Sequence, residues 1–231
     1  TGCGEEEIIE PVSHQVLYRP EGFPSFQEPV DNPATSDGVK LGRHLFYDPI
    51  LSGDQTQSCA GCHSQEYGFT DDLNQFSVGI DGIAGDKNSM QLINLLWSGD
   101  RLFWDGRANG LEELALEPVE NPIEMHAYWP DVVERLSNHP TYPGMFERAF
   151  GTSTITKELA AKAMAQFMRT LIAGNTRYHK YIYGLPGGYM SAEELRGMEL
   201  FFNEKGDCFH CHIDVRFTDN SFKNNGLNRV F

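Results

Sequence analysis

Two copies of one pentapeptide pattern constrain this chain more than any other feature. Residues 59–63 read Cys-Ala-Gly-Cys-His and residues 208–212 read Cys-Phe-His-Cys-His, so both fit C-x-x-C-H. In this pattern two thiols on one turn add to the two vinyl groups of one porphyrin, and the next residue supplies an imidazole to the iron. The sequence therefore predicts two covalently bound c-type haems. The predicted attachment and ligand residues are Cys59, Cys62 and His63 for the first haem, and Cys208, Cys211 and His212 for the second.

Two other uses of these cysteines fit less well. A single zinc site would need all four thiols, or two thiols and two imidazoles, around one metal ion, yet 145 residues separate the two pairs. A framework of disulfides is less expected still, because a chain of 231 residues can bury a core without covalent cross-links.

The charge balance limits the classes of partner. Lys and Arg together number 18 and Asp and Glu number 33, which gives a formal net charge of -15. Such a chain does not neutralise phosphates, so we expect no nucleic-acid partner. An electron donor with a basic contact face would be steered towards this charge, although a solubilising surface explains it equally well. No stretch approaches the roughly 20 apolar residues of a membrane span.

Covalent haem also predicts where the protein works. Haem c is normally assembled outside the cytoplasm, so we expect a periplasmic protein. The fifth cysteine, Cys3, lies in Thr-Gly-Cys-Gly, which is similar to the end of a bacterial lipoprotein signal. A lipid on Cys3 would hold a soluble domain at a membrane. An unmodified thiol in an acidic tail fits as well, because two residues precede Cys3, and no complete signal peptide is visible.

Apolar spacing and capping residues predict a mainly α-helical chain with weak strand signals. We expect Pro118 to stop one short helix and Gly174 to end the longest one. Thr156 is the expected N-cap of that longest helix, and Ser191 opens the last helix with a capping box. The predicted segments are an extended arm over 1–36, short helices over 111–116 and from 131, a longer helix over 157–173 and a helix from 191.

A shared tripeptide suggests that the chain has two related haem units. Phe-Thr-Asp follows each haem motif, at 69–71 and at 217–219. The sequence shows no wider repeat. We place the N-terminal haem domain at 37–165 and the C-terminal haem domain at 166–231.

Three further segments carry a resemblance to a known family. Residues 41–49 read Leu-Gly-Arg-His-Leu-Phe-Tyr-Asp-Pro, residues 103–107 read Phe-Trp-Asp-Gly-Arg, and residues 121–125 read Asn-Pro-Ile-Glu-Met. With the two haem motifs in the same order, the chain from about 38 to 227 resembles the bacterial di-haem cytochrome c peroxidase family. That family includes the methylamine-utilisation enzyme that matures a tryptophan-derived quinone.

The resemblance implies a fold and a set of roles. The implied fold is two cytochrome c-like domains, with hydrogen peroxide reacting at the first haem and electrons entering at the second. Trp104 matches the tryptophan between the haems, and Glu124 matches the acid–base residue of the peroxide pocket. Asn88 matches a side chain that helps to hold calcium, although its partners in the family lie beyond this chain's last residue, so calcium stays an open alternative.

The chain departs from the family at three places. Ile80 stands where peroxidases carry a distal histidine, so we expect the first iron to be five-coordinate or water-bound, unless Met125 or His126 binds it. Leu114 stands in place of a glutamine of the peroxide pocket, which removes one positioned hydrogen bond. The chain ends 19 residues after His212. We therefore expect a truncated second domain whose distal ligand comes from a missing C-terminal segment or a second subunit.

These features rank three functions. The first is an oxidoreductase, a periplasmic di-haem cytochrome c peroxidase that reduces hydrogen peroxide with electrons from a small donor protein, either a cytochrome c or a cupredoxin. The second is a di-haem oxidase that modifies a partner protein by long-range electron transfer. The third is an electron-transfer cytochrome without enzymatic activity.

Overall fold

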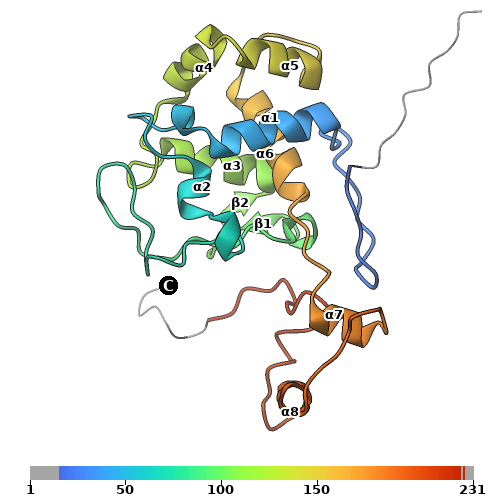
Figure 1. Cartoon of the computed structure of the whole chain (residues 1–231). Helices are drawn as coiled ribbons and strands as arrows, with labels where there is room; N and C mark the ends of the chain where they lie inside the picture. Colours follow the sequence, from blue (N-terminus) through green and yellow to red (C-terminus); the bar gives the residue numbers. More distant parts are fainter. Residues whose placement is uncertain (1–15, 225, 227–231) are drawn as a thin grey trace, which may run out of the picture.

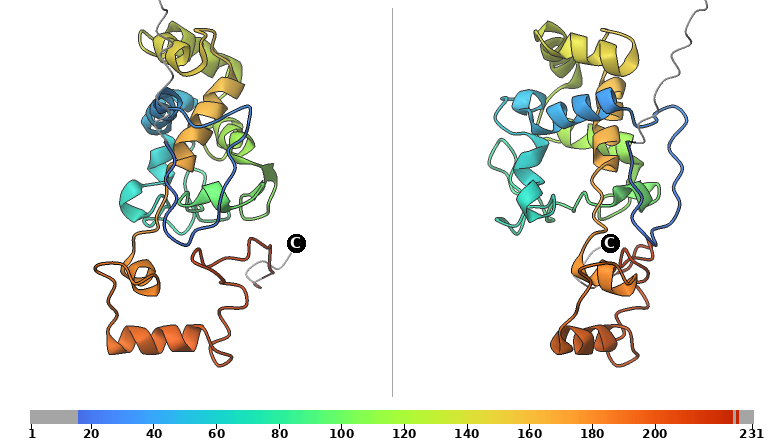
Figure 2. Two further views of the ribbon diagram at one scale, coloured as in Figure 1. Left: turned by 90° about the vertical axis from the view of Figure 1, so that its right-hand side faces the viewer. Right: turned by 45° about the vertical axis from the view of Figure 1, so that its right-hand side comes forward.

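The computed structural model describes residues 16–224 and residue 226, so Cys3 lies outside the described residues. Figure 1 shows a larger upper lobe and a smaller lower lobe, and the two views in Figure 2 agree. The mainly α-helical prediction is confirmed. The upper lobe holds α1 (Ser36–Tyr47), α2 (Cys59–Cys62), α3 (Leu111–Glu120), α4 (Trp129–Asn138), α5 (Tyr142–Phe150) and α6 (Lys157–Arg169), and the lower lobe holds α7 (Arg177–Ile182) and α8 (Ala192–Phe201).

Short elements join these helices. Strands β1 (Arg101–Leu102) and β2 (Ala108–Asn109) pair antiparallel, so the segment 103–107 is the loop of a small hairpin. The 3-10 turns are η1 (Pro49–Leu51), η2 (Gln65–Tyr67) and η3 (Leu95–Trp97). Of the helices in the described residues, none combines the length and the apolar character needed to cross a bilayer.

The core of the upper lobe is built where α1 crosses α6. Both helices begin at threonine N-caps, and Thr156 accepts the backbone N–H of Leu159 at 3.2 Å, as predicted. The helices approach so closely that a Cβ on Gly42 would lie 1.9 Å from the carbonyl oxygen of Ala163. Leu41, Leu45 and the alanines of α6 bury this contact, and α3 packs on the other side of α6.

One predicted helix end was wrong. Helix α3 continues through Pro118 to Glu120 rather than stopping before the proline. Proline removes only one backbone donor, and the carbonyls of the last turn find other partners. The N–H of Met125 donates to the Pro118 carbonyl, and the N–H of Ala127 donates to that of Val119. The chain therefore folds back beneath α3 and brings residues 121–125 beside it.

Two helices were not predicted. Tyr-Pro-Gly at 142–144 is typical of a turn, yet it opens α5, because a proline in the first turn of a helix loses no intrahelical hydrogen bond. Helix α7 is only six residues long and depends on its Thr176 N-cap. The longest helix also ends at Arg169, four residues earlier than expected. The domain boundary placed after residue 165 falls inside α6, so we draw it between α6 and α7.

Trp97 joins the two lobes and the N-terminal arm. Its indole N–H donates to the Pro24 carbonyl at 2.9 Å, and its ring packs on Phe23 with centroids 4.9 Å apart. Its own carbonyl accepts from Arg216 at 2.7 Å and from Asn220 at 3.0 Å, both in the lower lobe. The arm adds a second link, because the Glu21 carbonyl lies 2.7 Å from the Nε2 atom of His179 on α7.

We expect Gly42→Ala to destabilise the protein by about 1–3 kcal/mol, because the added methyl group overpacks the α1–α6 contact. Gly197→Ala is the matched control, since Gly197 lies inside α8 with nothing within 4 Å of an added Cβ. There the better helix propensity of alanine should raise stability by up to about 1 kcal/mol. Thermal and urea unfolding of both variants measure the difference. An unchanged midpoint for Gly42→Ala would contradict the packing argument.

Candidate haem sites

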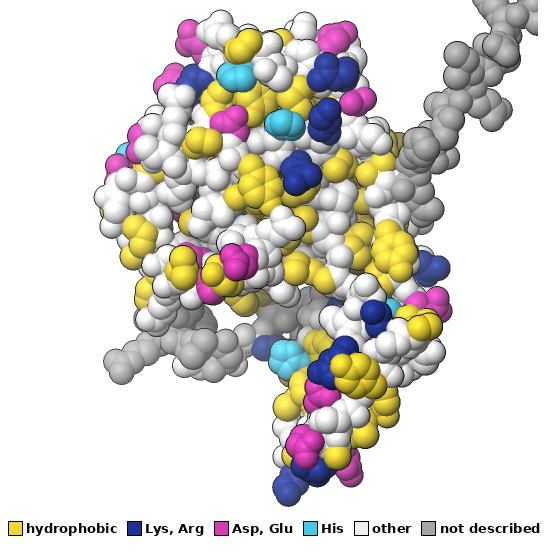
Figure 3. Space-filling model, in the orientation of Figure 1, with side chains coloured by type: hydrophobic (Ala, Val, Ile, Leu, Met, Phe, Trp, Pro, Cys, Tyr) yellow, Lys and Arg dark blue, Asp and Glu magenta, His cyan; other side chains and the backbone are white. Residues whose placement is uncertain are grey.

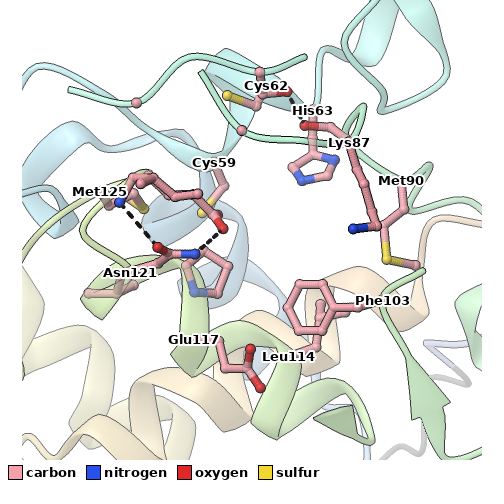
Figure 4. Close-up of a pocket in the computed structure, with 18 of the residues that line it drawn as sticks. Cys59, Cys62, His63, Lys87, Met90, Phe103, Leu114, Glu117, Asn121 and Met125 are labelled. Carbon is pink, nitrogen blue, oxygen red and sulfur yellow. Dashed lines mark hydrogen bonds between the residues drawn. The ribbon is translucent and has the colours of Figure 1, made fainter. Parts of the chain in front are cut away.

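The upper lobe contains a cavity of about 720 Å³ beside α2, within the range of roughly 300–1,000 Å³ for cofactor pockets. Figure 4 shows Cys59, Cys62 and His63 on one side of it and Phe103 and Leu114 on another. Its walls come from α2, the loop 77–90, the hairpin loop 103–107, α3, the segment 121–125 and two methionines of α6. The fold therefore gathers the first haem motif and the other two matched segments of predicted function around one space.

The first attachment motif is a single helical turn. Helix α2 consists of the four residues Cys59–Cys62, and the N–H of His63 closes the turn on the Cys59 carbonyl at 2.9 Å. Both cysteines are free thiols that line the cavity. Burial raises the pKa of the Cys59 thiol to about 12 and also raises that of Cys62. The turn brings two neutral thiols and one imidazole to the same wall, as porphyrin attachment requires.

His63 is oriented for metal binding through its Nε2 atom. Its Nδ1 atom lies 3.1 Å from the carbonyl oxygen of Phe69, which selects the tautomer with the proton on Nδ1. Burial lowers the pKa of the imidazole, so the neutral form is favoured. A neutral ring whose other nitrogen donates to a carbonyl is the usual form of a metal-bound histidine. These residues fit a haem iron.

The second motif repeats this geometry in the lower lobe. The N–H of His212 closes a turn on the Cys208 carbonyl at 3.0 Å, and its Nδ1 atom lies 2.9 Å from the Phe217 carbonyl. Phe69 and Phe217 both adopt a left-handed backbone, with φ of 60° and 56°. Non-glycine residues seldom do so. The repeated Phe-Thr-Asp thus corresponds to a repeated carbonyl latch on the proximal histidine.

The two sites differ in how much protein covers them. Cys62 and His63 are half-buried, whereas Cys211 and His212 are exposed. Figure 3 shows hydrophobic side chains among charges of both signs on the visible face of the lower lobe. The large apolar side chains exposed beside the second motif are Leu200, Phe202, Ile213 and Phe217.

Trp104 and Asn88 lie together at the cavity. Trp104 is 60% exposed, and its indole N–H donates to the Asn88 carbonyl at 2.8 Å. The Asn88 side chain donates to the carbonyls of Asp71 and Asn74 at 2.8 and 2.9 Å, and its Oδ1 atom accepts from the Thr70 hydroxyl at 3.1 Å. Thr70 follows the phenylalanine that holds His63. Asn88 therefore ties the tryptophan to the first proximal histidine.

Glu124 lies in the same cavity. Its Oε1 atom accepts from the side chain of Asn121 at 2.6 Å, and burial raises its pKa. Ile80 is absent from the described cavity wall, and its backbone N–H donates to the Glu124 carbonyl at 2.9 Å. Of the alternative ligands, His126 is an exposed residue bound to Asp81, while Met125 is buried and lines the cavity.

Three cavity residues were missed by sequence reasoning. Leu114 is 6% exposed and presents an apolar wall, as its sequence position suggested. One turn later Glu117 also lines the cavity, and Arg107 binds it at 2.7 Å. Asn121 orients Glu124. Helical spacing from Leu114 could have found Glu117, and the other two lie inside the matched segments.

Comparisons with known proteins agree with this geometry. The sequence model of the family described as di-haem cytochrome c peroxidase matches residues 36–186. The methylamine utilization protein MauG of Methylorubrum extorquens is 38% identical over 210 residues, which cover 90% of this chain and 58% of that protein. The cytochrome c551 peroxidase of Nitrosomonas europaea is 30% identical over 217 residues, covering 91% of this chain and 63% of that protein.

Solved structures give the same result. A MauG-like protein associated with microbial copper homeostasis superposes with a TM-score of 0.78 at 32% identity, covering 89% of this chain and 61% of that one. The diheme peroxidase BthA from Burkholderia thailandensis superposes with a TM-score of 0.70 at 25% identity, covering 81% and 52%. The chain thus spans about half to two thirds of the length of the relatives that it matches. It belongs to the di-haem cytochrome c peroxidase family.

Proposed function

We propose that this chain binds two haem c groups covalently and reduces hydrogen peroxide to water, in a protein that works in the periplasm. One observation carries the proposal: a latched His63 and a half-buried Glu124 line the same cavity, and His63 is the only histidine among the described lining residues. The reaction consumes two electrons and two protons for each peroxide and releases two waters. The haem irons would supply its redox chemistry.

The proton transfer is the part that this chain's own residues would perform. A carboxylate in the cavity can accept a proton from one peroxide oxygen and return it to the other. Asn121 holds the Glu124 carboxyl in one orientation, and burial keeps its pKa above the usual range, so the group can exchange a proton near neutral pH. We assign Trp104 to electron passage between the two sites, because it lies at the cavity and Asn88 fixes its indole.

A second function is supported by the exposure of Trp104 and by Leu114. In a di-haem oxidase, residues of a partner protein are oxidised by long-range electron transfer. An exposed tryptophan at the cavity would suit electron exchange with such a partner, and the apolar wall at Leu114 offers no hydrogen bond to peroxide. The methylamine utilization relative, at 38% identity, belongs to the same family.

The lower lobe indicates what the second haem needs. We propose that the haem and further polypeptide, from a longer chain or from a second subunit, cover the exposed apolar side chains around His212. A small cytochrome c or cupredoxin would deliver electrons there. Residues 177–231 hold seven cationic and seven acidic side chains, so the net charge of -15 lies entirely in residues 1–176. The donor therefore meets a neutral lobe beside a strongly acidic one.

Haem content tests the cofactor proposal directly. After expression in a host that matures c-type cytochromes, we expect two haems per chain in the wild type and one in either Cys59→Ala/Cys62→Ala or Cys208→Ala/Cys211→Ala. Cys3→Ala is the control and should keep two. Pyridine haemochrome spectra and intact-protein mass measure the number. A wild-type chain at bare polypeptide mass, or one containing zinc, would refute covalent haem.

Glu124→Gln tests the proton-transfer role. We expect the reaction with peroxide to slow by roughly 10²–10⁴-fold, because the amide cannot accept the proton. Stopped-flow mixing of the reduced holoprotein with peroxide, with reduced cytochrome c as donor, gives the rate. Glu134→Gln on exposed α4 is the control and should react as the wild type does. Equal rates in both variants would exclude Glu124 from the mechanism, and slow wild-type turnover would favour the oxidase.

Calcium is a further proposed cofactor, with the Asn88 side-chain oxygen as one ligand, because amide oxygens suit this cation. We expect chelator-treated wild-type holoprotein to bind one Ca²⁺ in a calorimetric titration. Asn88→Ala should weaken that binding at least about tenfold, whereas Asn74→Ala, which keeps the Asn88 amide, should not. Absence of binding by the wild type would leave Asn88 with only its role in holding Trp104.

A further inference from the structure

Helix α3 places a second carboxyl group in the wall of the first cavity. Glu117 follows Leu114 by three residues, so the two side chains lie on one face of the helix. Figure 4 shows both at the same edge of the cavity, with Glu117 extended beside the Leu114 side chain. The Glu117 side chain is 35% exposed, so it faces the cavity without being sealed from water.

Arg107 holds Glu117 in place. Its Nε atom donates to Glu117 Oε2 at 2.7 Å, and its Nη1 atom lies 3.0 Å from both oxygens of Asp105. The guanidinium carbon also lies 3.7 Å from the ring centroid of Phe103, within range of a cation–π contact. Asp105 and Phe103 belong to the same hairpin loop as Arg107, and β1 and β2 close that loop. The cation is therefore fixed from three sides.

Both members of this pair act on Glu124. Burial is the largest influence on the Glu124 carboxyl and raises its pKa, and the hydrogen bond from Asn121 lowers it. Arg107 lowers the pKa further, whereas Glu117 raises it. The charged or titratable groups in the described cavity wall are His63, Asp86, Lys87, Asp105, Arg107, Glu117, Glu120 and Glu124. Lys87 is bound by Asp86 at 2.9 Å, so Arg107 and Glu117 are the pair that sets the charge around Glu124.

We propose that Arg107 and Glu117 are positioning residues that form a fixed, charge-balanced wall of the first cavity and keep Glu124 able to exchange a proton. In this arrangement Glu117 is the polar group that α3 contributes to the cavity, where Leu114 contributes none. The inference rests on the proposed function of Glu124 and deepens it. The apolar side chain at Leu114 removes a hydrogen bond, and the ion pair restores polarity one helical turn away.

The two members of the pair should act in opposite directions. Glu117→Gln removes a negative charge and leaves Arg107 less neutralised, so the Glu124 carboxylate becomes easier to form and its titration moves to lower pH. Arg107→Gln removes the positive charge and leaves Glu117 unpaired, so the titration moves to higher pH. We expect shifts of about 0.5–1 pH unit each. The double variant should return close to the wild-type midpoint, because the pair is then replaced by neutral side chains.

The experiment is a double-mutant cycle on the holoprotein. The direct readout is the pH titration of the infrared carbonyl band of the protonated Glu124 carboxyl, assigned by its loss in Glu124→Gln. The second readout is the low-pH limb of the peroxide rate, which falls as the carboxylate is protonated and should move with the infrared midpoint. Glu113→Gln is the control, because it makes the same charge change on α3 while Glu113 accepts from the Asn109 N–H instead.

The outcomes separate the inference from the function. Arg107→Lys keeps the charge and guards against misfolding of Arg107→Gln; its midpoint should stay near that of the wild type. Opposite shifts that cancel in the double variant support the inference, even if no variant reduces peroxide and the proposed function fails. Shifts of the same sign, a double variant that does not return, or unmoved midpoints overturn it, even if Glu124→Gln abolishes turnover and so upholds the function.

Discussion

One hydrogen bond, made twice, organises both haem sites. In each lobe a phenylalanine carbonyl lies at about 3 Å from the Nδ1 atom of the proximal histidine, at 3.1 Å for His63 and 2.9 Å for His212. The bond turns Nε2 outward, and a partner on Nδ1 strengthens the imidazole as a ligand. It depends on a phenylalanine in a left-handed conformation, which costs backbone energy. The turn that follows each attachment helix therefore exists to aim one ring.

The upper lobe surrounds that ring with a rigid frame. The close approach of α1 and α6 at Gly42 fixes the helices behind the cavity, and the chain reversal after α3 brings Glu124 to face the space. The hairpin between β1 and β2 adds Trp104 and Arg107 from a third direction. Groups distant in sequence thus converge because helices, and not flexible loops alone, carry their anchoring points.

The sequence was informative where chemistry or periodicity is local. The attachment motifs, the Thr156 cap and the helical character could be predicted, because each depends on residues within one or two turns. The continuation of α3 through Pro118 could not, since it depends on backbone donors from residues 125 and 127 that arrive only when the chain folds back. Glu117 was missed for a related reason. Its place in the cavity follows from which face of α3 meets α6, a tertiary fact that a single amphipathic pattern leaves undetermined.

The junction at Trp97 gives the molecule a mechanical connection between its halves. Arg216, which donates to the Trp97 carbonyl, is the immediate neighbour of the phenylalanine that latches His212. A displacement of the lower lobe against the upper one would pull on that peptide and rotate the imidazole it holds. Because ring orientation and basicity tune the reduction potential of a bound iron, a protein docking on the lower lobe could alter the driving force for electron entry without touching the porphyrin.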